Sequence, residues 1–301
     1  MSTAQQRELY AILSAMSRRA RAPLVWDRFQ LAWGAQTWVM GIINVTPDSF
    51  SGDGLATDAD ATAWAALAVA QGTQQAQEGA RIVDVGGASS RPGAPTIAPA
   101  VEISRVVPTV RALAATLPRD IPISIDTTSA AVARAALAAG ANLINDISGL
   151  RADPGMAPLV AATGVPVIVM ANRRLIPQHE VVSDVTRYLA DSIERALAAG
   201  VPWEHIIIDP GFGFGNTPTE NVTLLRHLDA LLALNCPILL GVSRKSTLGT
   251  ILGDVPVTER REASLAAAVV GVLHGADIVR VHDVQATVRA LRVADAIVRE
   301  A

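Results

Sequence analysis

The sequence predicts a single (β/α)8 TIM barrel with a short N-terminal extension. Eight short apolar runs, rich in Val and Ile, alternate with eight alanine-rich helical stretches. The turns between them repeat one pattern, and the chain has 301 residues, of which 50% are hydrophobic. Eight strand–helix units in roughly 260 residues favour a closed parallel barrel in one domain.

The first 37 residues precede the alternating strands and helices and form the predicted extension. Residues 38–301 form the predicted barrel. The segment 1–20 is helix-prone and ends in a basic cluster, which we interpret as a solvated arm rather than a phosphate site. The cluster consists of Arg18, Arg19 and Arg21. The segment 24–38 is predicted to be a short β-type flap over one end of the fold. It carries Trp26, Trp33 and Trp38.

The repeating elements follow in chain order. Strands are predicted within residues 39–44, 81–87, 122–128, 143–149, 166–172, 205–211, 237–246 and 278–284. Helices are predicted within residues 58–78, 98–116, 130–139, 153–163, 181–199, 218–234, 258–274 and 284–300.

The helix-to-strand turns share one local pattern, in which glycine ends a helix, alanine packs in the turn and apolar residues open the next strand. It occurs at Gly79-Ala80, Gly140-Ala141 and Gly275-Ala276. A doubly wound sheet is the competing architecture. It normally has fewer strands, and no G-x-G-x-x-G follows the first strand here.

Composition narrows the class of protein. The formal net charge of −3 argues against a general affinity for nucleic acid or anionic membranes. The apolar runs are strand-sized, so no membrane span is expected. A single cysteine, Cys236, excludes an intrachain disulfide and fits a reducing compartment, so we expect a cytoplasmic enzyme.

Polar side chains gather where the predicted strands end, and in this fold those ends form one active-site mouth. They are Asn44, Asp84, Asp126, Asn145, Asp146, Asp209, Arg244, Lys245, Arg280 and His282. Carboxylates and carboxamides dominate the middle strands, and cations dominate the last two. This division suits a ligand with a hydrogen-bonding ring at one end and an anion at the other.

The residue types support specific roles. A buried aspartate accepts parallel N–H bonds from a 2-amino-pyrimidinone edge, and Asn145 both donates and accepts beside it. Arg280 and His282 lie two apart on one strand, so they share a face on which diphosphate oxygens can bind. Asn44 offers a hard amide oxygen suited to Mg²⁺ that arrives with phosphate.

Other features receive a structural interpretation. Asp84, Asp146 and Asp283 are assigned to turns or to supporting positions behind the site. The remaining histidines lack metal-ligand spacing, and the sequence has no Walker A motif, nucleophile elbow or zinc signature. The loops 44–54 and 86–94 mix Gly, Ser and Pro and are expected to act as lids, with Arg91 in reach of an anion.

Taken together, these residues resemble the dihydropteroate synthase family from Val39 to Ala301. The resemblance rests on Met40-Gly41-Ile42-Ile43-Asn44-Val45-Thr46-Pro47-Asp48-Ser49-Phe50-Ser51, Ser90-Arg91-Pro92-Gly93, Ile125-Asp126-Thr127, Ile144-Asn145-Asp146, Asp209-Pro210-Gly211, Gly213-Phe214-Gly215, Ser243-Arg244-Lys245-Ser246 and Arg280-Val281-His282-Asp283.

The resemblance implies condensation of 6-hydroxymethyl-7,8-dihydropterin diphosphate with 4-aminobenzoate in folate biosynthesis, by an SN1-like route in which diphosphate leaves early. It implies catalytic roles for Lys245, Arg280, His282 and Arg91. The implied pterin residues are Asp126, Asn145, Met170, Asp209, Phe214 and Lys245. The implied diphosphate or aminobenzoate residues are Asn44, Phe50, Ser90, Arg91, Pro92, Ser246, Arg280, Val281 and His282. Asn44 is the implied Mg²⁺ ligand, and a homodimer through barrel helices is implied.

The chain departs from the family pattern at the lids and the pocket rim. Ala88 stands where Glu is common, Ser90 where Thr is common, and Asn216 where Lys is common. Gly52-Asp53 inverts the usual order, and Val169-Met170-Ala171-Asn172 replaces a His-Met-Gln/Arg-Gly type of run. Two other hypotheses are a catalytically impaired pterin-binding paralogue and a pterin-dependent methyltransferase domain. A methyl donor has no diphosphate, so the basic strand ends argue against the latter.

Overall fold

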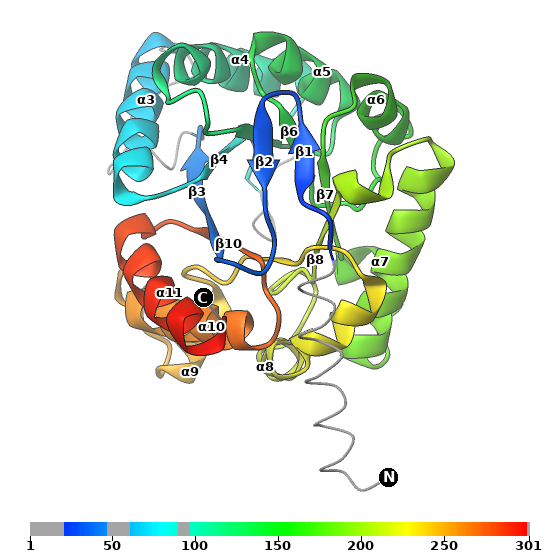
Figure 1. The fold of residues 1–301 in the computed structure, drawn as a ribbon, viewed down its shortest axis with the longest axis vertical. Helices are drawn as coiled ribbons and strands as arrows, with labels where there is room; N and C mark the ends of the chain where they lie inside the picture. Colours follow the sequence, from blue (N-terminus) through cyan, green and yellow to red (C-terminus); the bar gives the residue numbers. More distant parts are fainter. Residues whose placement is uncertain (1–20, 47–60, 90–96, 300–301) are drawn as a thin grey trace, which may run out of the picture.

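Eight parallel strands form a barrel in the computed structural model, which describes residues 21–46, 61–89 and 97–299 (Figure 1). They run in the order β8-β7-β6-β5-β4-β3-β10-β9, and a parallel bridge between Ile208 and Ile238 joins β8 to β9. The strands are β3 (Trp38–Asn44), β4 (Ile82–Gly86), β5 (Ile123–Asp126), β6 (Leu143–Asp146), β7 (Val167–Met170), β8 (Ile206–Asp209), β9 (Leu239–Leu240) and β10 (Ile278–Val281). The predicted barrel is confirmed.

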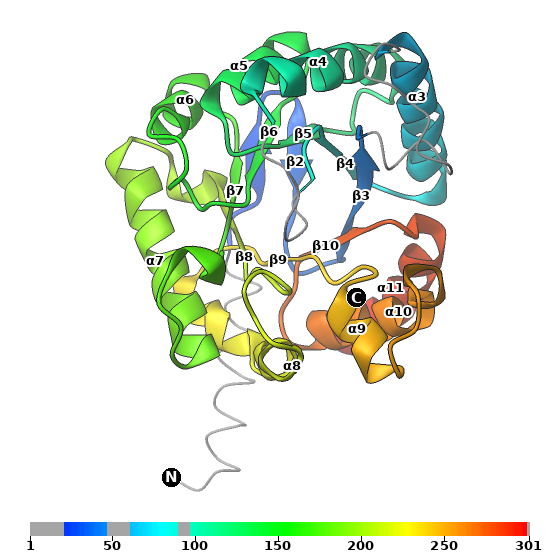
Figure 2. The same ribbon diagram turned by 180° about the vertical axis from the view of Figure 1, so that it is seen from behind.

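Helices surround the strands (Figure 2). They are α3 (Ala61–Glu78), α4 (Pro99–Thr116), α5 (Ala130–Ala139), α6 (Met156–Thr163), α7 (Val181–Ala198), α8 (Pro218–Arg226), α9 (Ser246–Ile251), α10 (Arg261–Leu273) and α11 (Val284–Val298). Four 3-10 turns lie between them: η1 (Arg173–Leu175), η2 (Trp203–His205), η3 (Leu228–Leu234) and η4 (Val257–Glu259). Within the described residues, no helix is both long and apolar enough to cross a membrane.

Two predicted elements differ from the structure. The helix expected over 218–234 divides at His227, whose φ of −117° and ψ of 28° leave the helical region, and continues as η3. The strand expected over 237–246 is limited to Leu239–Leu240. Arg244 takes a left-handed φ of 56°, which turns the chain into the unexpected short helix α9.

Successive side chains along each strand point alternately toward the helices and into the barrel interior. Val39, Val83 and Val279 belong to the large apolar cluster that includes residues of the helices, and Met40, Ile82 and Ile278 belong to a second cluster. The second cluster fills the amino-terminal end of the barrel. The inward positions toward the carboxyl ends are thereby left to the polar residues of the site.

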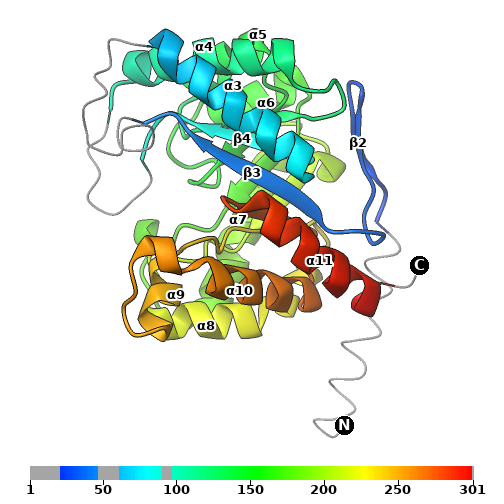
Figure 3. The ribbon, with the colours of Figure 1, turned by 90° about the vertical axis from the view of Figure 1, so that its left-hand side faces the viewer.

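An antiparallel hairpin closes the amino-terminal end (Figure 3). Its strands are β1 (Leu24–Trp26) and β2 (Phe29–Leu31). Leu24, Trp26, Phe29 and Leu31 pack against the first inward residues of the barrel strands, which are Met40, Ile82, Leu143, Ile168, Ile207, Leu239 and Ile278. The hairpin therefore acts as an apolar plug.

Arg21 does not behave as a solvated end of an arm. Its side chain is buried, and its Nη2 lies 3.0 Å from the Asp277 carboxylate. The interpretation of Arg21 as solvated is therefore wrong, because the hairpin draws the preceding residue under the barrel, where a carboxylate balances its charge. Arg18 and Arg19 lie outside the described residues.

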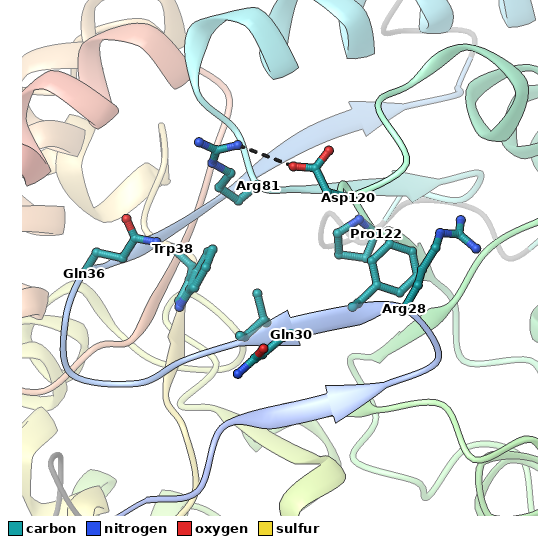
Figure 4. Close-up of a pocket in the computed structure, with 9 residues that line it drawn as sticks. Arg28, Gln30, Gln36, Trp38, Arg81, Asp120 and Pro122 are labelled. Atoms are coloured by element: carbon teal, nitrogen blue, oxygen red, sulfur yellow. Dashed lines mark ion pairs between the residues drawn. The ribbon is translucent and has the colours of Figure 1, made fainter.

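A groove of about 300 Å³ lies between this hairpin and the barrel (Figure 4). Its lining includes Arg28, Gln30 and Trp38, and on the barrel side Arg81 lies 3.8 Å from Asp120. The groove lies at the end opposite the polar strand ends, and so it is separate from the predicted active-site mouth.

The plug makes a stability prediction. We expect Leu24→Ala to lower the free energy of unfolding by about 2–5 kcal/mol, because a fully buried leucine leaves a cavity against the barrel floor. Val25 is the matched control, since it lies on the same strand with 54% of the residue's surface exposed. Urea unfolding of both alanine variants measures the difference. Equal losses would show that the hairpin is not a plug.

Candidate active site

A buried ionic cluster occupies the interior of the barrel below its carboxyl-terminal mouth. Arg280 donates from Nε to Asp84 Oδ2 at 2.6 Å and from Nη2 to Asp126 Oδ2 at 2.8 Å. Asn145 Nδ2 donates to the same Asp84 oxygen at 3.0 Å. Asp84 is fully buried. It therefore fixes the orientation of two predicted ligand-binding side chains at once.

The strand register explains why these residues meet. Asn44 pairs with Gly86, Gly86 with Asp126, and Asp126 with Asn145 across the four neighbouring strands β3 to β6. A β-carbon placed on Gly86 would lie 3.8 Å from Asp126 Oδ2 and 3.9 Å from Asn44 Oδ1. The amide oxygen of Asn44 and the carboxylate of Asp126 therefore flank the same glycine.

Burial changes the charge state of Asp126. Desolvation raises the pKa of this carboxyl to about 7, although the Arg280 guanidinium opposes the rise, and the negative charge of Asp84 adds to it. Near neutral pH the Asp126 carboxyl is therefore poised between its two protonation states, which is a common property of groups in functional clefts.

Asp209 lies on the next polar strand end, where it pairs in register with Met170. Its Oδ1 accepts a hydrogen bond from the Gly211 amide at 2.7 Å. Desolvation raises its pKa to about 6, against the effect of that hydrogen bond and of nearby Lys245. Met170 is almost fully buried and takes an inward position of β7. The two residues provide an acceptor beside an apolar surface.

Lys245 and Phe214 form a second part of the mouth. The Lys245 ammonium lies 4.2 Å from the centre of the Phe214 ring, and the Arg174 guanidinium lies 4.9 Å from it. Desolvation lowers the pKa of Lys245 to about 8, although the negative charge of Asp209 opposes the fall. The Phe214 ring thus lies beside two cations, and the ammonium of Lys245 is close enough to Asp209 for their charges to interact.

His282 stands beside Ser243, whose Oγ lies 3.1 Å from its Nδ1. Burial, together with the positive charges of Arg280 and Arg244, lowers the pKa of His282 to about 4. The imidazole is therefore neutral at pH 7 and offers a hydrogen-bond donor instead of a full charge.

The structure does not bring every predicted residue to this cluster. Val281 alternates outward into the apolar core shared with the helices, so its side chain points away from the mouth. Arg244 turns to Asp283 at 2.6 Å and lines a separate groove of about 520 Å³. Ser246 is exposed at the start of α9.

The four lid residues predicted to contact ligands lie outside the described residues, as do both predicted lids for most of their length. They are Phe50, Ser90, Arg91 and Pro92. Of the family departures, Gly52-Asp53 also lies outside the described residues, and Ala88 is exposed beyond β4.

One residue of the mouth, Arg174, was missed from the sequence, whereas Asp84 was assigned to a supporting or turn position. In the structure Asp84 has the supporting role, as the shared acceptor of Asn145 and Arg280. Its alternation with Gly86 on β4 could have placed it inside the barrel. Arg174 gave no sequence signal, because its contact with Phe214 spans two separate loops.

The arrangement has a defined chemical capacity. Buried carboxylates and a carboxamide can accept hydrogen bonds from a ring edge, and Met170 and Phe214 add apolar surface. Arg280, Lys245 and neutral His282 can donate to an anion. Within the described residues, no group of three or more His, Cys, Asp and Glu side chains could hold a metal alone.

Comparison with known proteins points in the same direction. A family model described as pterin binding enzyme matches residues 40–282. The dihydropteroate synthase of Clostridium beijerinckii is 45% identical over 267 residues, covering 88% of this chain and 96% of the relative. The Xanthomonas albilineans dihydropteroate synthase with 4-aminobenzoic acid has a TM-score of 0.81 at 43% identity, covering 87% of this chain and 93% of that one. The same enzyme in complex with 7,8-dihydropteroate has a TM-score of 0.78 at 41% identity, covering 87% and 94%.

The ionic cluster makes an electrostatic prediction. We expect Asp84→Asn to lower the pKa of Asp126 from about 7, because the negative charge that raises it is removed and the Arg280 charge is left unopposed. Carbon-13 NMR titration of the aspartate carboxyls measures the shift. Asp120→Asn, at the other end of the barrel, is the control and should leave Asp126 unchanged. A rise in the pKa of Asp126 would contradict this account of the cluster.

Proposed function

Because the chain belongs to the dihydropteroate synthase family of pterin-binding enzymes, we propose a division of the reaction among the residues of its mouth. The enzyme is a transferase of folate biosynthesis. It condenses 6-hydroxymethyl-7,8-dihydropterin diphosphate with 4-aminobenzoate to give 7,8-dihydropteroate and diphosphate. The observation that carries the assignment of roles is the convergence of Asp126, Asn145, Asp209 and Arg280 on one barrel interior.

The pterin binds on the carboxylate side of the mouth. Asp209 and Asp126 accept from the N–H groups of the pyrimidinone edge, and Asn145 adds its amide oxygen, since its nitrogen is committed to Asp84. Met170, Phe214 and the aliphatic stem of Lys245 border the ring. This set holds the ring so that its methylene carbon faces the anion-binding side chains.

The diphosphate binds on the opposite side, where Arg280, His282 and Arg91 donate to its oxygens. Arg280 is held by two carboxylates, so its guanidinium is preorganised before the ligand arrives. The C–O bond to diphosphate breaks early, and the ring stabilises the methylene cation. The mouth therefore acts mainly by stabilising the departing anion.

The residues present fit a magnesium ion that arrives with diphosphate. Asn44 Oδ1 at the end of β3 is a hard amide oxygen of the kind Mg²⁺ prefers, whereas the neighbouring Asp126 carboxylate is already paired with Arg280. Asn44 would hold the ion together with diphosphate oxygens and water. When bound, the ion neutralises charge on the leaving group.

The 4-aminobenzoate approaches last. Its neutral arylamine is already a nucleophile, so the site needs little general base, and the amine proton leaves to solvent or diphosphate. Phe50, Ser90, Pro92, Ser246 and the backbone beside Val281 border this subsite in the proposal.

Product analysis tests the reaction. Both substrates are mixed with enzyme and Mg²⁺, and dihydropteroate and diphosphate are measured separately. We expect the two products in equal amounts. Pterin binding without either product would favour an impaired paralogue and overturn the proposed activity.

We propose a homodimer in the cytoplasm. Four large apolar residues lie exposed in the second halves of α10 and α11: Val270, Leu273, Val293 and Ile297. Burying such a patch against a second copy is favourable. The single cysteine, Cys236, is free and buried, and burial raises the pKa of its thiol to about 12, so it serves no redox role.

The raised pKa values predict how pterin affinity depends on pH. As the pH falls through about 7 and then about 6, Asp126 and Asp209 take up protons and lose acceptor capacity, so affinity should fall. Asp209→Asn should weaken binding by about 1.5–3 kcal/mol and remove the lower step. Calorimetric titration with a pterin at several pH values measures both effects. Affinity independent of pH between 5 and 8 would exclude these residues as ionised acceptors.

The metal proposal predicts an order of binding. Mg²⁺ alone should not bind tightly to the enzyme, because Asn44 supplies a single neutral ligand, but it should bind when the pterin diphosphate is present. Chelation should stop turnover and leave the affinity for free pterin unchanged. Calorimetry with Mg²⁺, with and without diphosphate ester, measures this. Stoichiometric Mg²⁺ binding to the ligand-free enzyme would contradict the proposal.

The dimer proposal predicts a change of mass. Ile297, with 75% of the residue's surface exposed on α11, is the most exposed member of the patch, and Ile297→Glu should convert dimer to monomer because a charge resists desolvation. Leu197→Glu on α7 is the control. Light scattering after size exclusion measures both. A monomeric wild type, or a dimer unaffected by Ile297→Glu, would remove α11 from the interface.

A further inference from the structure

Arg173 is a fully buried arginine between two loops of the mouth, and no step of the reaction uses it. It follows β7, and it is the first among the largest fully buried side chains. Its Nη2 donates to Asp184 at 3.0 Å, and its Nη1 donates to Glu220 at 3.0 Å and to Asn216 at 2.8 Å. A buried guanidinium is costly, so the three partners gathered around its two Nη atoms indicate a specific role.

The partners come from three separate elements. Asp184 lies in the first turn of α7, where it also accepts from the His179 amide, and Glu220 lies in the first turn of α8, where it closes a capping box with Thr217. Hydrogen bonds from these groups hold the pKa values of both carboxyls below their usual range despite desolvation, so both are ionised. Arg173 thus links the first turns of α7 and α8 through ion pairs with Asp184 and Glu220.

Asn216 carries the connection into the loop that bears Phe214. Its Nδ2 donates to the Gly211 carbonyl at 3.3 Å and to Asn221 Oδ1 at 3.1 Å. The same Asn221 oxygen accepts from the Gly213 amide at 2.7 Å. The polar residues therefore fix both ends of the turn between Gly211 and Asn216.

The network also reaches the loop of Lys245. Asn221 Nδ2 donates to Thr247 Oγ1 at 2.8 Å, two residues beyond Lys245. The Arg173 amide donates to the Phe214 carbonyl at 3.1 Å. Both partners of the cation–π contact between Lys245 and Phe214 are thereby tied to one buried group.

The backbone of the loop that bears Phe214 packs so closely against the loop of Arg173 that neither loop can move alone. A β-carbon on Gly211 would lie 1.8 Å from the Ala171 carbonyl oxygen, and one on Gly215 would lie 2.6 Å from the Arg174 amide nitrogen. Both glycines have left-handed φ values, of 70° and 86°. A displaced Arg173 loop would therefore move the Phe214 loop with it.

We propose that Arg173 is a positioning residue that holds Phe214 and Lys245 around the pterin through a buried charge network, and that its cation compensates for the neutral Asn216. This deepens the proposed function and rests on it. Asn216 Oδ1 touches the guanidinium, so a lysine at this position would place a cation among the same carboxylates. The charge is required there, and either loop can supply it.

A charge-exchange experiment tests the proposal. Arg173→Met should raise the KM for the pterin diphosphate by about tenfold or more, since a misplaced wall weakens binding, and should leave the KM for 4-aminobenzoate within about twofold. Asn216→Lys alone should also raise the pterin KM, because two cations then crowd two carboxylates. The double variant Arg173→Met/Asn216→Lys should recover to within about threefold of the wild type.

The control variants separate positioning from folding. Arg173→Lys keeps the charge with fewer hydrogen bonds and should fall between the wild type and Arg173→Met. If Arg173→Met does not fold, Arg173→Lys and Asn216→Lys are compared by calorimetry with free pterin, and unchanged affinity in both would overturn the proposal. Equal rises in both KM values, or no recovery in the double variant, would also overturn it. A wild type without turnover would instead contradict the proposed function.

Discussion

The balance of buried charge around Arg280 is the constraint on which the rest of the mouth depends. An arginine inside a barrel is costly unless carboxylates accept its N–H groups. Asp84 and Asp126 do so at 2.6 and 2.8 Å, and Asp84 also holds Asn145. The same contacts that stabilise the guanidinium therefore orient Asp126 and Asn145, the residues proposed to bind the ring. In that proposal, one connected cluster binds both ends of the ligand.

The fold was predictable because its signals are local. Buried parallel strands rich in Val and Ile, and glycines that end helices at Gly79, Gly140 and Gly275, identify the units, and all three glycines have left-handed φ values in the structure. The predictions that were wrong concern segments whose own residues do not determine their structure. The apolar run at 237–246 does not show that Arg244 leaves the strand geometry, and an arginine in an N-terminal arm does not reveal that it will meet Asp277.

The site was only partly predictable, because its parts are joined across long stretches of sequence. Strand ends identified Asp126, Asn145, Asp209 and Arg280, since a barrel brings such ends together. The supporting role of Asp84 depends on Arg280, 196 residues away. Val281 was carried over with its motif, and only strand alternation shows that its side chain faces the helices. The spacing of residues along the chain shows neither the contact between Asp84 and Arg280 nor the direction of the Val281 side chain.

The electrostatic state of the mouth also bears on how diphosphate is received. Arg280 is already paired and burial keeps His282 neutral, its pKa lowered to about 4. In the proposed reaction, diphosphate bound beside the imidazole would favour its charged form and raise the pKa of His282. The mouth would then gain positive charge in response to the ligand instead of carrying it beforehand. A fixed excess of buried cations costs stability in the empty enzyme, whereas a histidine that takes up a proton only beside the anion would not.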